Sequence, residues 1–176
     1  MHCPAEWKGS PMSAAAPLIT LESAVTAPLL DAARELFSEY ARSLNIDLDF
    51  QNFNAELARL PGAYAAPSGC LLLAYVDGVL AGCGALRALP DVDQPNACEM
   101  KRLYVRPAFR RFGLGRVLAQ ALLDAARRSG YSVMLLDTLD EMASARGLYA
   151  ALGFTEIAPY YFNPIRGVHY LQAELG

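Results

Sequence analysis

The sequence has few residues that could bind a metal ion. It contains two histidines, His2 and His169, and four cysteines that form no C-x-x-C pair. Structural zinc sites need closely spaced Cys and His ligands, so we expect no metal. Cys70, Cys83 and Cys98 lie in or beside apolar runs, and we interpret them as small buried hydrophobic residues. Thiols without a disulfide pattern are typical of the cytoplasm.

The sequence also lacks a long apolar segment and an excess of positive charge. It has no uninterrupted run of the roughly 18 apolar residues that a membrane-spanning helix needs. Its start has no basic region followed by an apolar stretch, which argues against secretion. The net charge of -3 and pI near 5.4 argue against broad electrostatic binding to the phosphates of a nucleic acid. We therefore expect no nucleic-acid partner and no membrane partner.

Apolar residues are plentiful, at 54% of a chain of 176 residues. That length and composition are typical of one globular domain with its own core. The first 17 residues, MHCPAEWKGSPMSAAAP, are rich in Pro, Ala and Ser without periodicity, and we interpret them as a flexible leader. The domain is expected to cover residues 18–176.

The hydrophobic periodicity predicts an alternation of strands and helices within that domain. Asp77-Gly78 is a strong hairpin signal between two apolar runs, and Pro107, Gly130 and Gly153 mark element ends. We predict strands at 18–22, 71–76, 79–86, 97–105, 133–136, from Phe154, and 168–173, with helices at about 28–43, 52–60, 113–128 and 143–152. This order predicts an α/β fold with a mixed sheet.

The start of the predicted helix at 113–128 has the features of a phosphate site. Gly113 and Gly115 carry no Cβ, and a helix N-terminus presents free N–H groups and a positive dipole end. Arg110, Arg111 and Arg116 add positive charge, without the motifs of nucleoside triphosphatases or of dinucleotide-binding proteins. The pattern favours a pyrophosphate bound without magnesium, and a solvated charged helix start is the alternative.

The order Arg110-x-x-Gly113-x-Gly115 after a strand and Val-x-Pro resembles the acetyl-CoA motif of the GNAT superfamily of N-acetyltransferases. A second stretch, residues 145–154, is similar to the family pattern A-x-x-L-Y-x-x-L-G-F. Seven residues before Tyr149 the family usually has an asparagine, whereas this chain has Met142, and Ser144 is a candidate substitute. The resemblance spans nearly the whole domain.

The resemblance implies a mixed, mostly antiparallel sheet of about six to seven strands with about four flanking helices. It also implies a splayed parallel strand pair at the cofactor cleft, where acetyl-CoA is the acetyl donor. The implied cofactor-binding residues are the strand end and the loop and helix start that follow it: Leu103, Tyr104, Val105, Arg110, Arg111, Phe112, Gly113, Leu114, Gly115 and Arg116. An ordinary, fully paired core strand is the alternative for residues 103–105.

Acetyl transfer to an amine needs a proton acceptor and a proton donor. The resemblance implies Tyr149 as general acid toward the thiolate and Glu99 as general base. Strand alternation places Glu99, Lys101, Leu103 and Val105 on one face, and a partly closed cleft is expected to raise the pKa of the Glu99 carboxyl. The alternatives are an ion-paired Glu99 and a Tyr149 that serves as a core aromatic.

The acceptor is expected to be an amine of a small molecule or peptide. Tyr160 and Asn163 follow the strand that borders the acceptor cleft, so they are candidate substrate contacts, with simple packing as the alternative. We expect direct attack in a ternary complex; a ping-pong reaction on Cys83 or Cys98 is a minor option. A noncatalytic acyl-CoA-binding regulatory module and a transferase for another acyl chain or acceptor are the rival functions. The oligomeric state stays open, although members of the superfamily often form homodimers.

Overall fold

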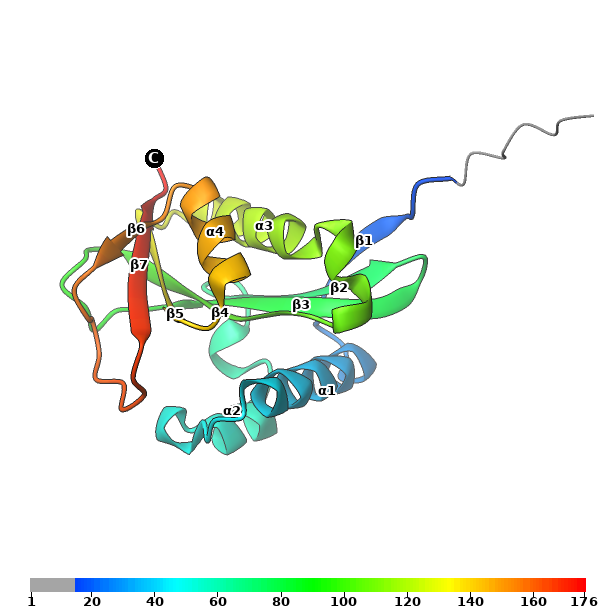
Figure 1. Ribbon diagram of the computed structural model, residues 1–176, viewed down its shortest axis with the longest axis horizontal. Helices are drawn as coiled ribbons and strands as arrows, with labels where there is room; N and C mark the ends of the chain where they lie inside the picture. Colours follow the sequence, from blue (N-terminus) through cyan, green and yellow to red (C-terminus); the bar gives the residue numbers. More distant parts are fainter. Residues whose placement is uncertain (1–14) are drawn as a thin grey trace, which may run out of the picture.

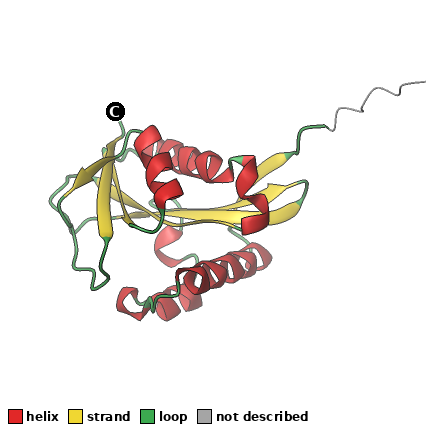
Figure 2. Ribbon diagram, viewed as in Figure 1, coloured by secondary structure: helices red, strands yellow, loops and turns green. Residues whose placement is uncertain are grey.

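The computed structural model describes residues 15–176 of the chain. The leader expected over residues 1–17 therefore lies almost entirely outside the described residues. The first element begins at Ile19, one residue after the predicted start of the domain. Figure 1 shows the arrangement of the elements, and Figure 2 shows their type.

One sheet of seven strands runs through the described residues, in the order β1-β2-β3-β4-β5-β7-β6. The only parallel neighbours in that order are β4 and β5, and the remaining pairs are antiparallel. This is the predicted mixed, mostly antiparallel sheet. The strands are β1 (Ile19–Ser23), β2 (Cys70–Val76), β3 (Val79–Ala88), β4 (Ala97–Val105), β5 (Val133–Leu139), β6 (Thr155–Ile157) and β7 (Val168–Glu174).

Helices cover both faces of this sheet (Figure 1). One layer holds α1 and α2, and the opposite layer holds α3 and α4. The helices are α1 (Ala27–Leu44), α2 (Phe53–Arg59), α3 (Leu114–Arg128) and α4 (Ala143–Ala151), with 3₁₀ turns η1 (Asp49–Gln51), η2 (Gly62–Tyr64) and η3 (Pro107–Phe112). The predicted elements are confirmed, but the 3₁₀ turns were not foreseen and β5 continues three residues beyond the predicted end at Leu136.

Each helical layer is held by the apolar stripe that its sequence predicts. Leu36 and Phe37 of α1 are fully buried against one face of the sheet, and Leu118 and Leu122 of α3 are fully buried against the other. Residues three or four apart project from one side of a helix, so each helix presents a continuous apolar face to the strands. The sheet between these two cores is therefore fixed on both sides.

Two irregularities in the middle of the sheet position the site. The parallel ladder between β4 and β5 ends at Glu99 opposite Leu135, although β4 continues to Val105 and β5 to Leu139. In β4, Arg102 has a φ of 57° and the register with β3 shifts there, as in a β-bulge. The strands therefore diverge, and the alternation of side chains along β4 is interrupted.

Candidate active site

A cavity opens where β4 and β5 diverge. Its walls are Met100 to Leu103 of β4, Leu136 to Leu139 of β5, Tyr149 of α4, and residues of α1 and of the segments that follow it. Backbone groups at an unpaired strand edge need other partners, and ligand amides are suitable ones. The ladder geometry rules out the alternative in which residues 103–105 belong to a strand paired along both edges.

The predicted phosphate loop forms a 3₁₀ turn that leads directly into α3. Gly113 has a φ of 71° and caps α3, a left-handed conformation that glycine adopts without a Cβ clash. The Arg110 and Arg111 side chains are exposed beside this helix start. Arg110 donates a hydrogen bond from Nε to the Val105 carbonyl at 3.2 Å, and Arg111 lies over the Phe112 ring, 4.7 Å from its centroid.

Gly115 differs from Gly113 because the fold does not require glycine at this position. No positive φ is recorded for Gly115, and an added Cβ would meet only the Leu148 Cδ2 atom, at 3.5 Å. That is an ordinary van der Waals contact. A Cβ would therefore fit at Gly115 without a clash. Its absence leaves room for a ligand to approach the start of the helix closely.

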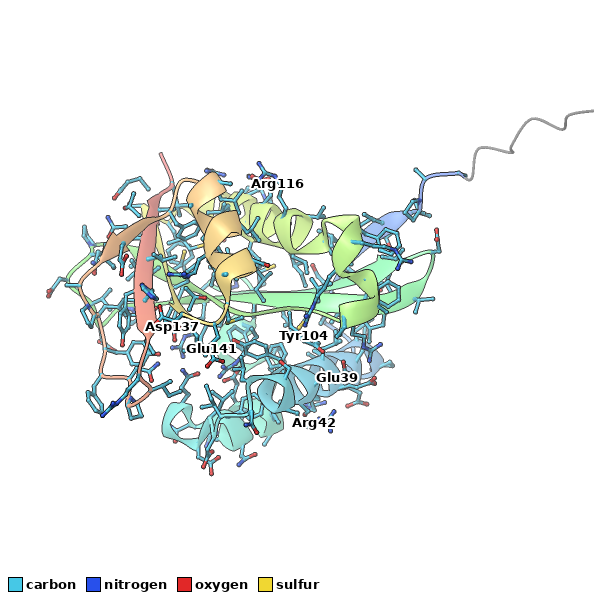
Figure 3. All side chains as sticks on the ribbon, in the orientation of Figure 1. Glu39, Arg42, Tyr104, Arg116, Asp137 and Glu141 are labelled. Atoms are coloured by element: carbon cyan, nitrogen blue, oxygen red, sulfur yellow. The ribbon has the colours of Figure 1, made fainter. Side chains whose placement is uncertain are left out.

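The other predicted cofactor residues divide into backbone and side-chain groups. Leu114 is fully buried and Tyr104 is 8% exposed, so their side chains belong to the two cores. The main chain of these two residues is the part that we expect to contact a cofactor. Arg116 is exposed on α3, and Figure 3 shows it on the outer side of the upper helical layer.

Tyr149 is buried at 6% exposure and lines the cavity between the diverging strands. Burial raises the pKa of its hydroxyl, and the neighbouring Tyr40 and Asp137 raise it further. The Tyr149 hydroxyl therefore stays protonated at neutral pH. The Tyr149 ring packs edge-on against Phe154, with centroids 5.6 Å apart, so it is both a core aromatic and a potential proton donor.

The carboxylate that shares this cavity with Tyr149 is Asp137 on β5, which the sequence analysis did not single out. Asp137 is half-buried, and its Oδ2 accepts a hydrogen bond from the Tyr161 hydroxyl at 2.8 Å. No cationic side chain of residues 15–176 forms an ion pair with it. One signal could have revealed it: a polar residue directly after a predicted parallel strand, at the edge where α/β sheets bind ligands.

Glu99 does not line that cavity. It is 1% exposed, and its Oε2 lies 2.6 Å from Arg87 Nη2. Burial raises the pKa of the Glu99 carboxyl, but the charges of Lys101 and Arg87 and hydrogen bonds from Tyr160 and Arg87 outweigh it, and the net pKa is lowered. The expected raised pKa is therefore wrong, and the ion-paired alternative describes this residue.

The expectation that Glu99, Lys101, Leu103 and Val105 share one face is also wrong. Leu103 and Val105 pack against the α3 side of the sheet. Lys101 lies 3.6 Å from Glu99 Oε1, and the following residue, Arg102, reaches Glu56 of α2. The bulge at Arg102 inserts one residue and reverses the alternation beyond it.

The two predicted acceptor contacts lie close to the two carboxylates. The Tyr160 hydroxyl donates to Glu99 Oε1 at 2.9 Å. Asn163 lines the cavity of Tyr149 and donates from Nδ2 to the Tyr161 hydroxyl at 2.9 Å. Tyr160 and Tyr161 also pack on each other, with centroids 5.3 Å apart. Packing and polar contact thus occur together in this segment.

Comparison with known proteins agrees with this geometry. A family model described as the acetyltransferase (GNAT) family matches residues 30–154. The chain belongs to the GNAT family. The match begins within α1 and ends at the residue before β6, and so it includes both diverging strands, the phosphate loop and Tyr149.

Relatives of this GNAT protein extend over most of its length. An uncharacterized N-acetyltransferase of Schizosaccharomyces pombe is 41% identical, covering 87% of this chain and 93% of the relative. An uncharacterized N-acetyltransferase of Dictyostelium discoideum is 32% identical, covering 77% and 89%. A solved Salmonella typhimurium protein, described as an acetyltransferase with its cofactor acetyl-CoA, has a TM-score of 0.69 at 24% identity, covering 90% and 95%.

In this GNAT protein, Cys83 and Cys98, the two candidates for a ping-pong reaction, do not have the properties of nucleophiles. Cys83 and Cys98 are fully buried, and burial raises the pKa of Cys83 and raises that of Cys98 to about 12. A thiol that stays protonated at neutral pH is a poor nucleophile.

Within residues 15–176, no three or more His, Cys, Asp or Glu side chains are grouped to hold a metal ion. None of the helices described is long and apolar enough to cross a membrane.

Proposed function

We propose that this protein transfers the acetyl group of acetyl-CoA to a primary amine of a small molecule or peptide, by direct attack in a ternary complex. The observation that supports this most is that Tyr149 and Asp137 line the same cavity, between strands whose ladder has ended. One residue offers a proton, and the other can accept one.

The donor is assigned to the loop and helix start beside this cavity. The pyrophosphate of acetyl-CoA would bind the first N–H groups of α3, above the open position at Gly115, with Arg110 supplying charge. The pantetheine arm would lie along the free edge of β4 at residues 103–105, with its amides bonded to the main chain. The Salmonella neighbour, which contains acetyl-CoA, supports this donor.

In the proposed reaction, the neutral amine nitrogen attacks the thioester carbonyl carbon. The C–N bond forms, the C–S bond breaks, and the sulfur leaves as a thiolate that takes the Tyr149 proton. The attacking nitrogen becomes acidic as the C–N bond forms, so Asp137 accepts its proton. Solvent then restores the Tyr149 proton and removes the proton from Asp137, which leaves the N-acetyl product and CoA.

The general-base role expected of Glu99 passes to Asp137 in this scheme. A carboxylate whose pKa is lowered by two cations is a weak base. Glu99 instead holds Arg87 and Lys101 in place through ion pairs at 2.6 and 3.6 Å. We assign it a positioning role.

The first experiment measures acetyl-CoA binding by calorimetry and then CoA thiol release with a panel of amines. Release with one class of amine supports acetyl transfer. Binding without release from any amine favours a noncatalytic acyl-CoA-binding module, and no binding contradicts the donor assignment.

Tyr149→Phe then tests the proton donor. It should lower kcat by about 100-fold, with an unchanged Kd for acetyl-CoA because the ring remains. Tyr131→Phe is the matched control, since this hydroxyl donates to the Ser68 carbonyl and lies outside the cavity lining. Equal kcat in wild type and Tyr149→Phe would remove Tyr149 from the mechanism.

A further inference from the structure

A second cavity adjoins the one that contains Tyr149 and Asp137. It has a volume of about 290 Å³, and Gln51, Lys101 and Arg102 line both cavities. This second cavity lies on the α1–α2 side of the sheet, where Glu99 and Tyr160 also face it. The two cavities thus meet at Gln51, Lys101 and Arg102, and Lys101 can contact a ligand in either one.

Two of the three cations in the second cavity are already neutralised. Arg102 donates from Nε and Nη2 to the two carboxylate oxygens of Glu56, at 3.0 and 2.7 Å. Arg87 donates from Nε to Glu99 Oε2 at 2.8 Å, and its Nη2 lies 2.6 Å from the same oxygen. Each guanidinium is thus hydrogen-bonded to a carboxylate and needs no further anion.

Lys101 is the exception. Its side chain is 6% exposed, and its Nζ lies 3.6 Å from Glu99 Oε1, an oxygen that already accepts the Tyr160 hydroxyl. No residue in the described part of the chain accepts a hydrogen bond from this ammonium. The Lys101 ammonium has three donors and is not fully enclosed by protein, so it is open to a ligand in the two cavities that it lines. An anionic ligand atom in the cavity would stabilise it.

We propose that the acceptor is an amine that also carries a carboxylate, such as a free amino acid. This rests on the proposed acetyl transfer. The acceptor's carboxylate accepts hydrogen bonds from Lys101, and its amino group lies at Asp137; both residues line the first cavity. Of the three cations that line the second cavity, Lys101 is the one without a hydrogen-bonded carboxylate among residues 15–176. Its single positive charge matches a carboxylate better than a phosphate dianion.

The second cavity also has an apolar part. Leu89, Val92 and the rings of Tyr160 and Phe162 contribute to its lining, and Phe162 is 85% exposed. The body of the acceptor beyond its two charged groups would contact this wall. An amine with a carboxylate and an apolar side chain therefore fits the chemistry of both cavities.

The test compares amino acids with their carboxamides, which keep the amine and lose the negative charge. With the wild-type protein, kcat/KM for the acid should exceed that for the carboxamide by about tenfold or more, the effect of a hydrogen bond between charged groups. Lys101→Met should remove this preference, and Lys101→Arg, which keeps the charge, should retain most of it. Calorimetric binding of acetyl-CoA to each variant checks that it is folded.

Equal kcat/KM for acid and carboxamide with the wild-type protein would overturn the proposal and leave acetyl transfer intact. A preference that persists in Lys101→Met would also overturn it, because the carboxylate would then bind elsewhere. CoA release from none of the amines, acidic or neutral, would overturn both this proposal and the proposed function.

Discussion

Two carboxylates on neighbouring strands, Glu99 on β4 and Asp137 on β5, are placed in opposite electrostatic situations. Glu99 is buried and ion-paired to Arg87 and Lys101. Asp137 is half-buried and accepts hydrogen bonds from the neutral groups of Tyr161 and Asn163. The position in the sequence motif favoured Glu99 as the base, but the partners of each group favour Asp137. Charge compensation therefore decides between them.

The substitution with the largest expected effect tests directly which of the two carboxylates is the general base. Asp137→Asn should lower kcat by about 100-fold or more, because the amide cannot accept the amine proton. The control is Glu141→Gln, an exposed carboxylate four positions along the chain, which should retain wild-type kcat. Steady-state kinetics with saturating acetyl-CoA measures both. A larger loss of kcat in Glu99→Gln than in Asp137→Asn would return the base to Glu99.

The two substitutions should affect stability in the opposite order, with the larger loss in Glu99→Gln. Glu99→Gln leaves Arg87 and Lys101 without their carboxylate, which should lower the free energy of unfolding by roughly 3 kcal/mol. This is the lower end of the range for buried pairs, because the Arg87 side chain is 37% exposed. Asp137→Asn removes no ion pair among the described residues and should change stability little. Urea unfolding at pH 7 measures both.

The pH dependence of stability gives a second readout for Glu99. Its pKa in the folded protein is lowered from the ordinary value of 4.5, so the folded state favours the carboxylate more than the unfolded state does. The resulting stabilisation is present above about pH 4.5 and is lost as the pH falls through the lowered pKa. Urea unfolding from pH 7 down to pH 3 should show a steeper loss for wild type than for Glu99→Gln. Parallel curves would contradict the ion-paired state.

The sequence predicts most of the fold because its signals are local. The stripe of Leu36 and Phe37 in α1 and the hairpin at Asp77-Gly78 depend on residues a few positions apart. The choice of base depends on contacts between distant segments. Arg87 and Glu99 lie opposite each other across β3 and β4, and Tyr160 reaches Glu99 from 61 residues away. The bulge at Arg102 then alters the alternation that sequence reasoning assumes.

Donor binding should be independent of both carboxylates. Arg110→Ala should weaken acetyl-CoA binding by about 10- to 100-fold, the effect of losing a charged hydrogen bond, with little change in kcat at saturating donor. Arg128→Ala, an exposed cation at the opposite end of α3, is the control. Calorimetry of both variants measures the Kd. Equal affinities would move the pyrophosphate away from Arg110.

The smallest expected effect distinguishes two glycines of the phosphate loop: Gly113, which the backbone conformation requires, and Gly115, which we expect ligand binding to require. Gly113→Ala places a Cβ at a φ of 71° and should cost about 1 kcal/mol of stability. Gly115→Ala meets only Leu148 at 3.5 Å, so its stability should be unchanged or slightly higher. Its Kd for acetyl-CoA should nevertheless rise about fivefold, as expected when one backbone hydrogen bond to the ligand is disturbed. Thermal unfolding and calorimetry on both variants measure the two quantities. Unaltered affinity in Gly115→Ala would mean that the pyrophosphate does not lie over this helix start, whereas the comparison of Asp137 with Glu99 would stand.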